Sequence, residues 1–347
     1  MASINSFVGK QISNYLIKEE LASGSFGSVY RAEHIILTGR TVAIKVLHTH
    51  LLTKESEQFI QEARFLERLK HDNILPIIDV GFNSNFPYII IEYVPNGSLR
   101  ERIQRQPTKS LPIEETLIIL SQVGRALEHA HQQNIIHRDL KPENILFNAR
   151  SEVLLADFGI AVVLETARTA PADIVGTPSY MAPEQFDGLV SKKSDQYALA
   201  CIAYELLTSH RPFVGPNDIA IALKHKTENV IAPTQLNTNI PIHIEQAILK
   251  AMSKNRTDRH SDILAFIMSM YNSGNKDGWI NEGRAYLKAK RYKEALKSFE
   301  HAISLAPNSA DGYSGKADAL MALGQYIEAT DYYNRSMQIS RMKTKLT

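Results

Sequence analysis

The last quarter of the chain repeats its own pattern with a period of 34 residues, and this restricts what that part can fold into. Trp279 aligns with Tyr313, and the two copies cover 279–306 and 310–339. Each copy has the apolar spacing of two helices separated by a turn. A period of this length with helix–turn–helix character predicts stacked helical hairpins that bury their apolar faces against one another.

The first copy resembles the tetratricopeptide repeat family through Trp279, Gly283, Tyr286, Ala295, Phe299, Ala302 and Pro307. The second copy departs from it at Leu320, Ser336 and Arg341. About three repeats are usually needed for a stable stack. Two copies would therefore continue in a longer parent chain, dimerise, or lean on the preceding domain. The resemblance implies a protein partner on a concave helical surface; a packing or self-association appendage is the alternative.

Composition excludes several other classes of protein. The chain has 347 residues, which predicts two or three domains, and its net charge of +2 gives no support to nucleic-acid binding. The single cysteine, Cys201, rules out an intramolecular disulfide framework and fits a reducing compartment. Met1–Lys10 lacks the pattern of a signal peptide, and Ile263–Tyr271 is too short an apolar run to span a membrane. We therefore expect a cytoplasmic location.

The order of predicted elements indicates two lobes ahead of the repeats. Tyr15–Val46 alternates like strands, 55–69 has helical spacing, and Tyr88–Ile91 is a further strand. Behind them, helices are predicted at Thr116–Gln132, Ser194–Thr208 and Ile244–Met252. This pattern, strand-rich in front and helix-rich behind, predicts an α+β fold. Met270–Gly278 is polar and contains glycine, and is typical of a linker.

The octapeptide His137–Asn144, HRDLKPEN, carries the strongest functional signal. It fills five fixed positions of the pattern H-R-D-L-x-x-x-N, which chance would match in roughly one of three million windows. Residues of about 12 to 268 accordingly resemble a eukaryotic-type (Hanks-type) serine/threonine protein kinase domain. Its combination with helical repeats resembles bacterial signalling kinases. The implied fold has a β-rich N-lobe at about 12–94 and an α-rich C-lobe at about 95–268, followed by a linker at 269–278 and repeats at 279–340.

The resemblance implies a role for each charged residue of this loop. Asp139 would orient the substrate hydroxyl and accept its proton, and Lys141 would contact the γ-phosphate of ATP. Asn144 and Asp157, the latter in the sequence Asp157-Phe158-Gly159, would hold Mg²⁺ or Mn²⁺. Asp195 would hold the backbone of the catalytic loop.

The phosphate cradle is predicted between two strands, at Ala22, Gly24 and Gly27. Glycine lets backbone N–H groups approach phosphate oxygens. Ala22 stands where the family has its first glycine, so its methyl group is expected to raise the Michaelis constant for ATP without removing activity. Lys45 would lie on the α- and β-phosphates, positioned by an ion pair with Glu62.

The family resemblance also implies the adenine pocket. Ile91 would be the gatekeeper, and backbone groups of Glu92 and Val94 would bond the adenine. The apolar residues expected to sandwich the ring are Val29, Ala43 and Leu146.

Lys141 and the sequence Gly176-Thr177-Pro178 resemble serine/threonine kinases rather than tyrosine kinases. Arg138 precedes the catalytic aspartate, which implies activation by loop phosphorylation, with Thr169 and Thr166 as candidate sites. The predicted function is transfer of the γ-phosphate of ATP to Ser/Thr of protein substrates. The alternative is a pseudokinase scaffold acting through its repeats, for which Ala22 is the sequence argument.

Overall fold

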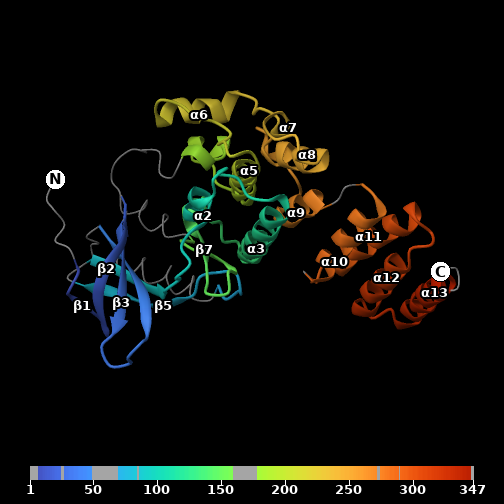
Figure 1. Ribbon diagram of the computed structural model, residues 1–347, viewed down its shortest axis with the longest axis horizontal. Helices are drawn as coiled ribbons and strands as arrows, with labels where there is room; N and C mark the ends of the chain where they lie inside the picture. The colour runs from blue at the N-terminus through green and yellow to red at the C-terminus, as the bar shows by residue number, and fades with distance from the viewer. Residues whose placement is uncertain are drawn as a thin grey trace. The chain divides into compact units, whose positions relative to one another are not determined.

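A computed structural model describes residues 7–24, 27–48, 69–83, 86–158, 178–271, 274–288 and 290–344. The chain divides into two compact units, 1–229 and 230–347 (Figure 1). The first unit holds a β-sheet and a helical lobe. The second holds short helices followed by the repeats. The predicted helix at 55–69 and the candidate sites Thr166 and Thr169 lie outside the described residues, except for Leu69.

The N-terminal lobe is a six-stranded antiparallel sheet in the order β1-β2-β3-β4-β6-β5. Its strands are β1 (Gln11–Ile12), β2 (Tyr15–Ser23), β3 (Gly27–His34), β4 (Thr41–Leu47), β5 (Ile77–Asn83) and β6 (Phe86–Glu92). Alternation decides which face is buried: Val42, Ile44 and Val46 join a core with Tyr30 and Ile90.

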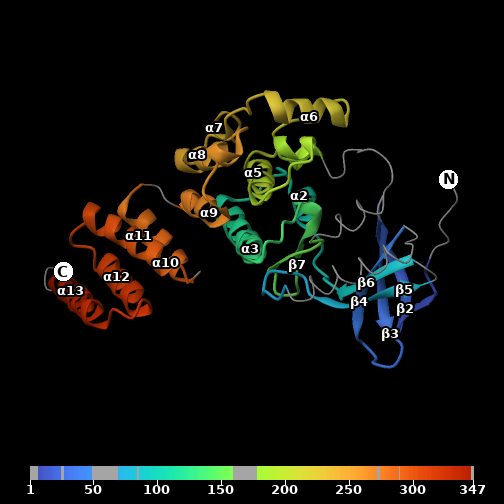
Figure 2. The ribbon, with the colours of Figure 1, turned by 180° about the vertical axis from the view of Figure 1, so that it is seen from behind.

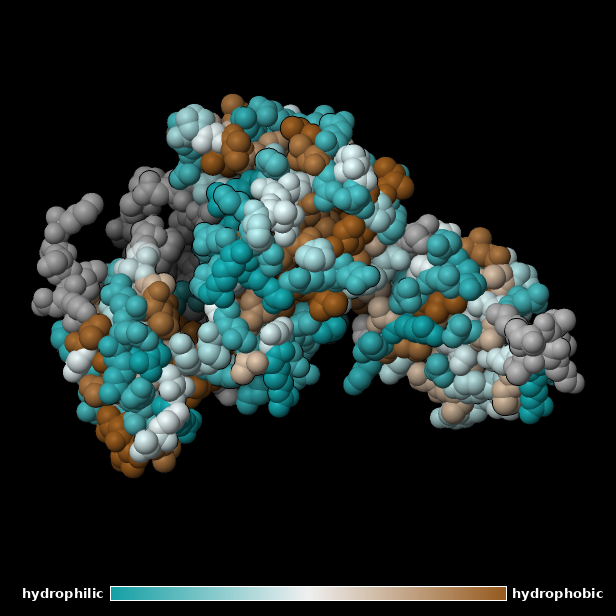
Figure 3. All heavy atoms as spheres, in the orientation of Figure 1, coloured by the Kyte–Doolittle hydropathy of each residue, from teal (hydrophilic) through white to brown (hydrophobic). Residues whose placement is uncertain are grey.

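One end of this sheet carries apolar side chains into solvent. Ile35, Ile36 and Leu37, in the turn between β3 and β4, are all exposed. Figure 3 shows this tip as a hydrophobic patch on an otherwise largely polar lobe.

The helical lobe of the first unit surrounds one almost wholly buried helix, α5 (Lys192–Thr208). Its other elements are α2 (Leu99–Arg105), α3 (Ile113–Gln132), η1 (Pro142–Asn144), β7 (Ile145–Phe147), β8 (Val153–Leu155), η2 (Pro178–Tyr180), η3 (Pro183–Asp187) and α6 (Asp218–Thr227). Figure 2 shows α2, α3 and α5 grouped together, and β7 lies between this group and the sheet. Ser98 begins α2 by accepting a hydrogen bond from the Glu101 amide.

The second unit contains α7 (Pro233–Leu236), α8 (Ile242–Ala251), η4 (Arg256–Asp258), α9 (Ile263–Tyr271), α10 (Lys276–Lys288), α11 (Tyr292–Leu305), α12 (Ala310–Ala322) and α13 (Tyr326–Thr344). The last four helices form the two predicted helix pairs. Residues 272–275 separate α9 from α10, so both helices extend into the segment 269–278 that was expected to be a linker. None of the helices in the described ranges is long and apolar enough to cross a membrane.

Close packing around one ring holds the repeats together. Phe299 of α11 is fully buried. A methyl group on Gly283 of α10 would come within 2.7 Å of this ring, and one on Gly315 of α12 would also collide with it. Helices on both sides of α11 can approach only because these positions lack a side chain.

Candidate active site

The catalytic loop brings three predicted residues into direct contact. Lys141 Nζ donates to Asp139 Oδ2 at 2.6 Å, and Asn144 Nδ2 donates to the Asp139 carbonyl at 2.8 Å. The turn η1 accounts for this geometry, because it folds the chain back between Lys141 and Asn144. This hydrogen bond through Nδ2 orients the Asn144 amide group, whose Oδ1 can act as an acceptor or ligand.

Asp195, at the start of α5, supports this loop from below. Its carboxylate accepts the backbone N–H groups of His137 at 2.9 Å and Arg138 at 3.0 Å. It also contacts the His131 ring at 2.7 Å. Arg138 has a φ of 71°, a left-handed conformation that costs energy for a residue with a side chain. The predicted role of Asp195 in holding the loop backbone is confirmed.

The electrostatics of Asp195 follow from the same contacts. Burial raises the pKa of this carboxyl, but the hydrogen bond and charge of His131 outweigh burial and bring the pKa below its ordinary value. The neighbouring His137 ring is fully buried and donates to the Ala156 carbonyl at 2.8 Å. That bond ties the catalytic loop to the residue preceding Asp157.

Lys45 and Asp157 meet although 112 residues separate them. The Lys45 ammonium, on β4, donates to Asp157 Oδ2 at 2.7 Å. Burial raises the pKa of Asp157, whereas the charge and hydrogen bond of Lys45 lower it. The net pKa lies below its ordinary value. Glu62, the partner predicted for Lys45, lies outside the described residues.

The predicted cradle is a tight approach between strands. The Gly24 amide donates to the Gly27 carbonyl at 3.0 Å. A Cβ on Gly27 would lie 2.5 Å from the Val46 carbonyl oxygen, so this position excludes any side chain. Ala22 is exposed and pairs with Val29 across β2 and β3. Ala22 therefore lies on β2, two residues before Gly24 of the predicted cradle.

Four of the residues expected around adenine are linked by strand pairing or by shared packing. Ala43 pairs with Ile91 across β4 and β6. Ile91, Val94 and Leu146 pack on a buried cluster of Leu75, Leu154 and Ala156. The Glu92 amide donates to the Pro76 carbonyl at 3.4 Å, so Glu92 would offer a ligand its own carbonyl oxygen.

Sequence reasoning missed a cavity, which lies beside Ile91. Its walls are Lys45, Leu69, Ile74, Leu75, Ile77, Ile89, Ile91, Leu155, Asp157 and Phe158. The signal was present in the apolar run of β6, but the pattern alone does not distinguish a cavity wall from solid core. Ile91 thus contributes both to the predicted adenine pocket and to this cavity.

Comparisons with known proteins agree with this geometry. Residues 15–277 match the protein kinase domain family, and 276–309 and 310–341 each match a tetratricopeptide repeat family. The chain is 39% identical over 260 residues to serine/threonine-protein kinase PrkC of Bacillus subtilis, covering 73% of this chain and 39% of that protein. It is 35% identical over 255 residues to serine/threonine-protein kinase PknB of Mycobacterium leprae, covering 71% of this chain and 40% of that protein.

A solved structure is also similar: the PknI kinase domain of Mycobacterium tuberculosis, with a TM-score of 0.58 and 26% identity, covers 76% of this chain and 97% of that one. This chain belongs to the protein kinase family, and it carries two tetratricopeptide repeats after the kinase domain. The bacterial relatives fit the predicted bacterial type. The predicted bilobal fold with helical repeats is confirmed. The chain spans about two fifths of the length of PrkC and PknB.

Proposed function

We propose that this chain is an active serine/threonine protein kinase that transfers the γ-phosphate of ATP to protein hydroxyl groups. The observation that carries the proposal is the convergence of five residues on one site. Asp139, Lys141 and Asn144 are joined by hydrogen bonds in the catalytic loop, and Lys45 of β4 pairs with Asp157. The two groups are linked because the amide of Ala156, next to Asp157, donates to the Asn144 carbonyl at 2.8 Å. Phosphoryl transfer needs little else from a protein than such positioning and charge stabilisation.

Asp139 would act on the acceptor. Its Oδ2 is held by Lys141, so the carboxylate has a defined direction before substrate arrives. An acceptor hydroxyl hydrogen-bonded to Asp139 would give up its proton as the attacking oxygen gains charge. Lys141 is then placed to stabilise negative charge on the transferred phosphoryl group. Asp195 is a positioning residue for both, because it fixes the backbone that precedes them.

ATP fits the N-terminal lobe. The tight approach at Gly27, the Ala43 wall and the Lys45 ammonium, with Leu146 of the helical lobe, would accommodate a nucleoside triphosphate. Asn144 and Asp157 would hold Mg²⁺, or Mn²⁺, through oxygen atoms. Mg²⁺ in phosphoryl-transfer sites is usually held by one or two side-chain oxygens together with substrate phosphates, so phosphate oxygens would complete the coordination. Such an ion supplies charge neutralisation on the phosphates.

Recruitment and regulation complete the proposal. The boundaries we propose are 12–268 for the kinase domain and 279–340 for the repeats, which would bind a protein partner. Phosphorylation of Thr169 or Thr166 would pair with Arg138 and order the activation loop. Lys141 and Thr177 favour serine and threonine as acceptors.

The test is transfer of labelled γ-phosphate to a generic basic protein and to a mixture of serine and threonine peptides, with Mg²⁺ or Mn²⁺. Wild-type protein should label them, and Asp139→Asn should lose about a thousandfold or more in rate while it still binds ATP. Lys45→Met serves as a second variant at a separate point of the site. ATP binding without transfer by the wild-type chain would instead identify a pseudokinase scaffold.

A further inference from the structure

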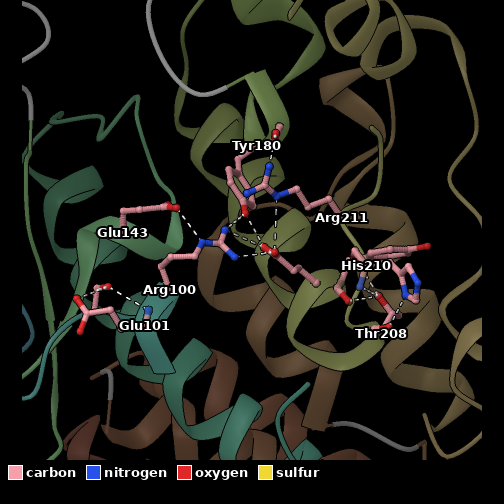
Figure 4. Close-up of polar contacts among 11 residues, drawn as sticks. Arg100, Glu101, Glu143, Tyr180, Thr208, His210 and Arg211 are labelled. Atoms are coloured by element: carbon pink, nitrogen blue, oxygen red, sulfur yellow. Dashed lines mark hydrogen bonds and ion pairs between the residues drawn. The ribbon is translucent and has the colours of Figure 1, made fainter. Parts of the chain in front are cut away.

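Arg100 lies at the centre of a saturated polar cluster beside the catalytic loop. Its Nε donates to Glu143 at 2.8 Å, and its Nη1 donates to Glu205 at 2.8 Å. Its Nη2 donates to the Tyr180 hydroxyl, which in turn donates to Glu205 at 2.5 Å. Figure 4 shows the Arg100 side chain reaching between Glu143 and Tyr180. The guanidinium fork is therefore used on all three nitrogens.

The cluster joins the catalytic loop to two other elements of the helical lobe. Glu143 belongs to η1, two residues after Lys141. Tyr180 belongs to η2. Glu205 projects from α5, and its side chain is only 8% exposed. Glu143, four residues after Asp139, and Glu205 would thus both lose this guanidinium partner if Arg100 were absent.

Arg100 is held there firmly. Burial lowers the pKa of its guanidinium, but the hydrogen bonds and charges of Glu205, Tyr180 and Glu143 raise it overall above its ordinary value. Its side chain is 14% exposed, whereas that of Glu143 is 42% exposed. A second arginine, Arg211, donates to the Ser179 hydroxyl at 3.3 Å and lies 3.7 Å from Glu205. Two guanidinium groups therefore balance the two carboxylates.

We propose that Arg100 is a specificity-determining residue. It binds the carboxylates of Glu143 and Glu205 and thereby prevents basic residues of the substrate from binding them. This inference rests on the proposed kinase activity. A substrate arginine would have to displace a bound guanidinium to reach the same carboxylates. Wild-type protein should consequently show no preference for basic residues near the acceptor. Removal of Arg100 should create that preference, because Glu143 and Glu205 would then accept a substrate guanidinium.

The experiment compares kcat/KM for two sets of serine and threonine peptides. One set carries alanine at the positions flanking the acceptor, and the other carries arginine at each position in turn. For wild-type protein, the arginine-to-alanine ratio should stay close to one at every position. Arg100→Ala should raise the ratio about tenfold at one or more positions, the size expected of one charge-assisted hydrogen bond. Arg100→Lys, which keeps the charge, should stay nearer to wild type.

Two further variants separate specificity from structure. Adding Glu143→Gln to Arg100→Ala should reduce the acquired preference. Glu143→Gln in the wild-type background should leave the ratio unchanged, since Arg100 already occupies that carboxylate. A merely structural role for Arg100 would lower kcat/KM for both peptide sets alike.

Several results would overturn the inference. They are an arginine preference in wild-type protein, a ratio unchanged by Arg100→Ala, or a wild-type ratio that falls on Glu143→Gln. The wild-type profile and Glu143→Gln decide the matter even where Arg100→Ala does not fold. Failure of wild-type protein to phosphorylate any peptide is a different outcome, which would remove the proposed function and this inference with it.

Discussion

The first unit and the repeats are each stabilised internally by a different kind of interaction. The first unit contains buried charged residues. As whole residues, Asp195 is 1% exposed and Glu205 is 6% exposed, and each accepts hydrogen bonds from neighbouring donors. The repeats are instead held by close apolar packing, in which the Phe299 ring lies against Gly283 and Gly315. The repeats' ion pair of Arg284 with Asp311 lies in solvent.

This contrast separates what serves chemistry from what serves packing. Removing charges from water is expensive, and a buried ion pair is often no more stabilising than an apolar one of similar volume. Charges are therefore expected where they orient a reacting loop or control a substrate. A recruitment platform needs only a rigid surface, and close apolar packing provides it. Substitutions in the two parts should accordingly differ in whether they affect catalysis.

The largest effect is expected from Asp195→Ala. It would leave the His137 and Arg138 amides and the His131 ring without their acceptor, at a cost of about 4 kcal/mol in the free energy of unfolding. Loss of the loop backbone geometry should also lower the phosphorylation rate about 100-fold. Urea denaturation and a peptide assay measure the two. Asp195→Asn, which keeps one acceptor oxygen, should lose less of each; equal loss would contradict this account.

Phe299→Ala should destabilise the repeats by about 3 kcal/mol, because it leaves a cavity between three helices. Peptide phosphorylation should remain unchanged at temperatures where the kinase domain is folded. Thermal unfolding followed by circular dichroism, alongside a peptide assay, tests both statements. A drop in peptide kcat/KM as large as the one expected for Asp195→Ala would erase the distinction between the two parts.

Gly315→Ala gives a sharper test, because two effects have opposite signs. Alanine in place of glycine inside a helix normally stabilises by about 0.5–1 kcal/mol. Here the added methyl group would collide with the Phe299 ring, so a net destabilisation of about 1–2 kcal/mol is expected. Ser314→Ala, at the adjacent position of α12, is the matched control and should change stability little. A more stable Gly315→Ala variant would show that the ring can move aside.

The smallest effect is expected at Asp262, which begins α9 and bonds Arg291 at 3.2 Å. Burial raises the pKa of this carboxyl, but its bonds with the Ala265 amide and Arg291 bring the pKa below its ordinary value of 3.8. A lowered folded-state pKa means that the charged form stabilises the fold above pH 3.8, and that this contribution is lost as the pH falls through the folded-state pKa.

Asp262→Asn keeps the helix cap and removes the charge. It should cost about 0.5–1 kcal/mol at pH 7 and less at pH 2, as measured by urea denaturation at both values. A difference from wild type that persists unchanged at pH 2 would assign the effect to the cap rather than to the ion pair.

Local patterns carried much of the fold and the site. Period-two alternation predicted the strands of the N-lobe, and the 34-residue period predicted four helices that the structure contains. The family resemblance implied joint roles for Asp139, Lys141 and Asn144, which lie within six consecutive residues of one motif. The role of Asp195 depended on family resemblance, because its contacts with the loop span 57 and 58 residues.

By itself, then, the sequence determined the repeat architecture, the catalytic loop and the family, all of which are written in residues close together along the chain. Tertiary structure alone decided that Lys45 contacts Asp157, that Ile91 borders a cavity, and that Arg100 bonds both Glu143 and Glu205. The physical reason is separation: Arg100 and Glu205 lie 105 residues apart, and only the packing of α2 against the rest of its lobe brings a guanidinium and a carboxylate within hydrogen-bond distance.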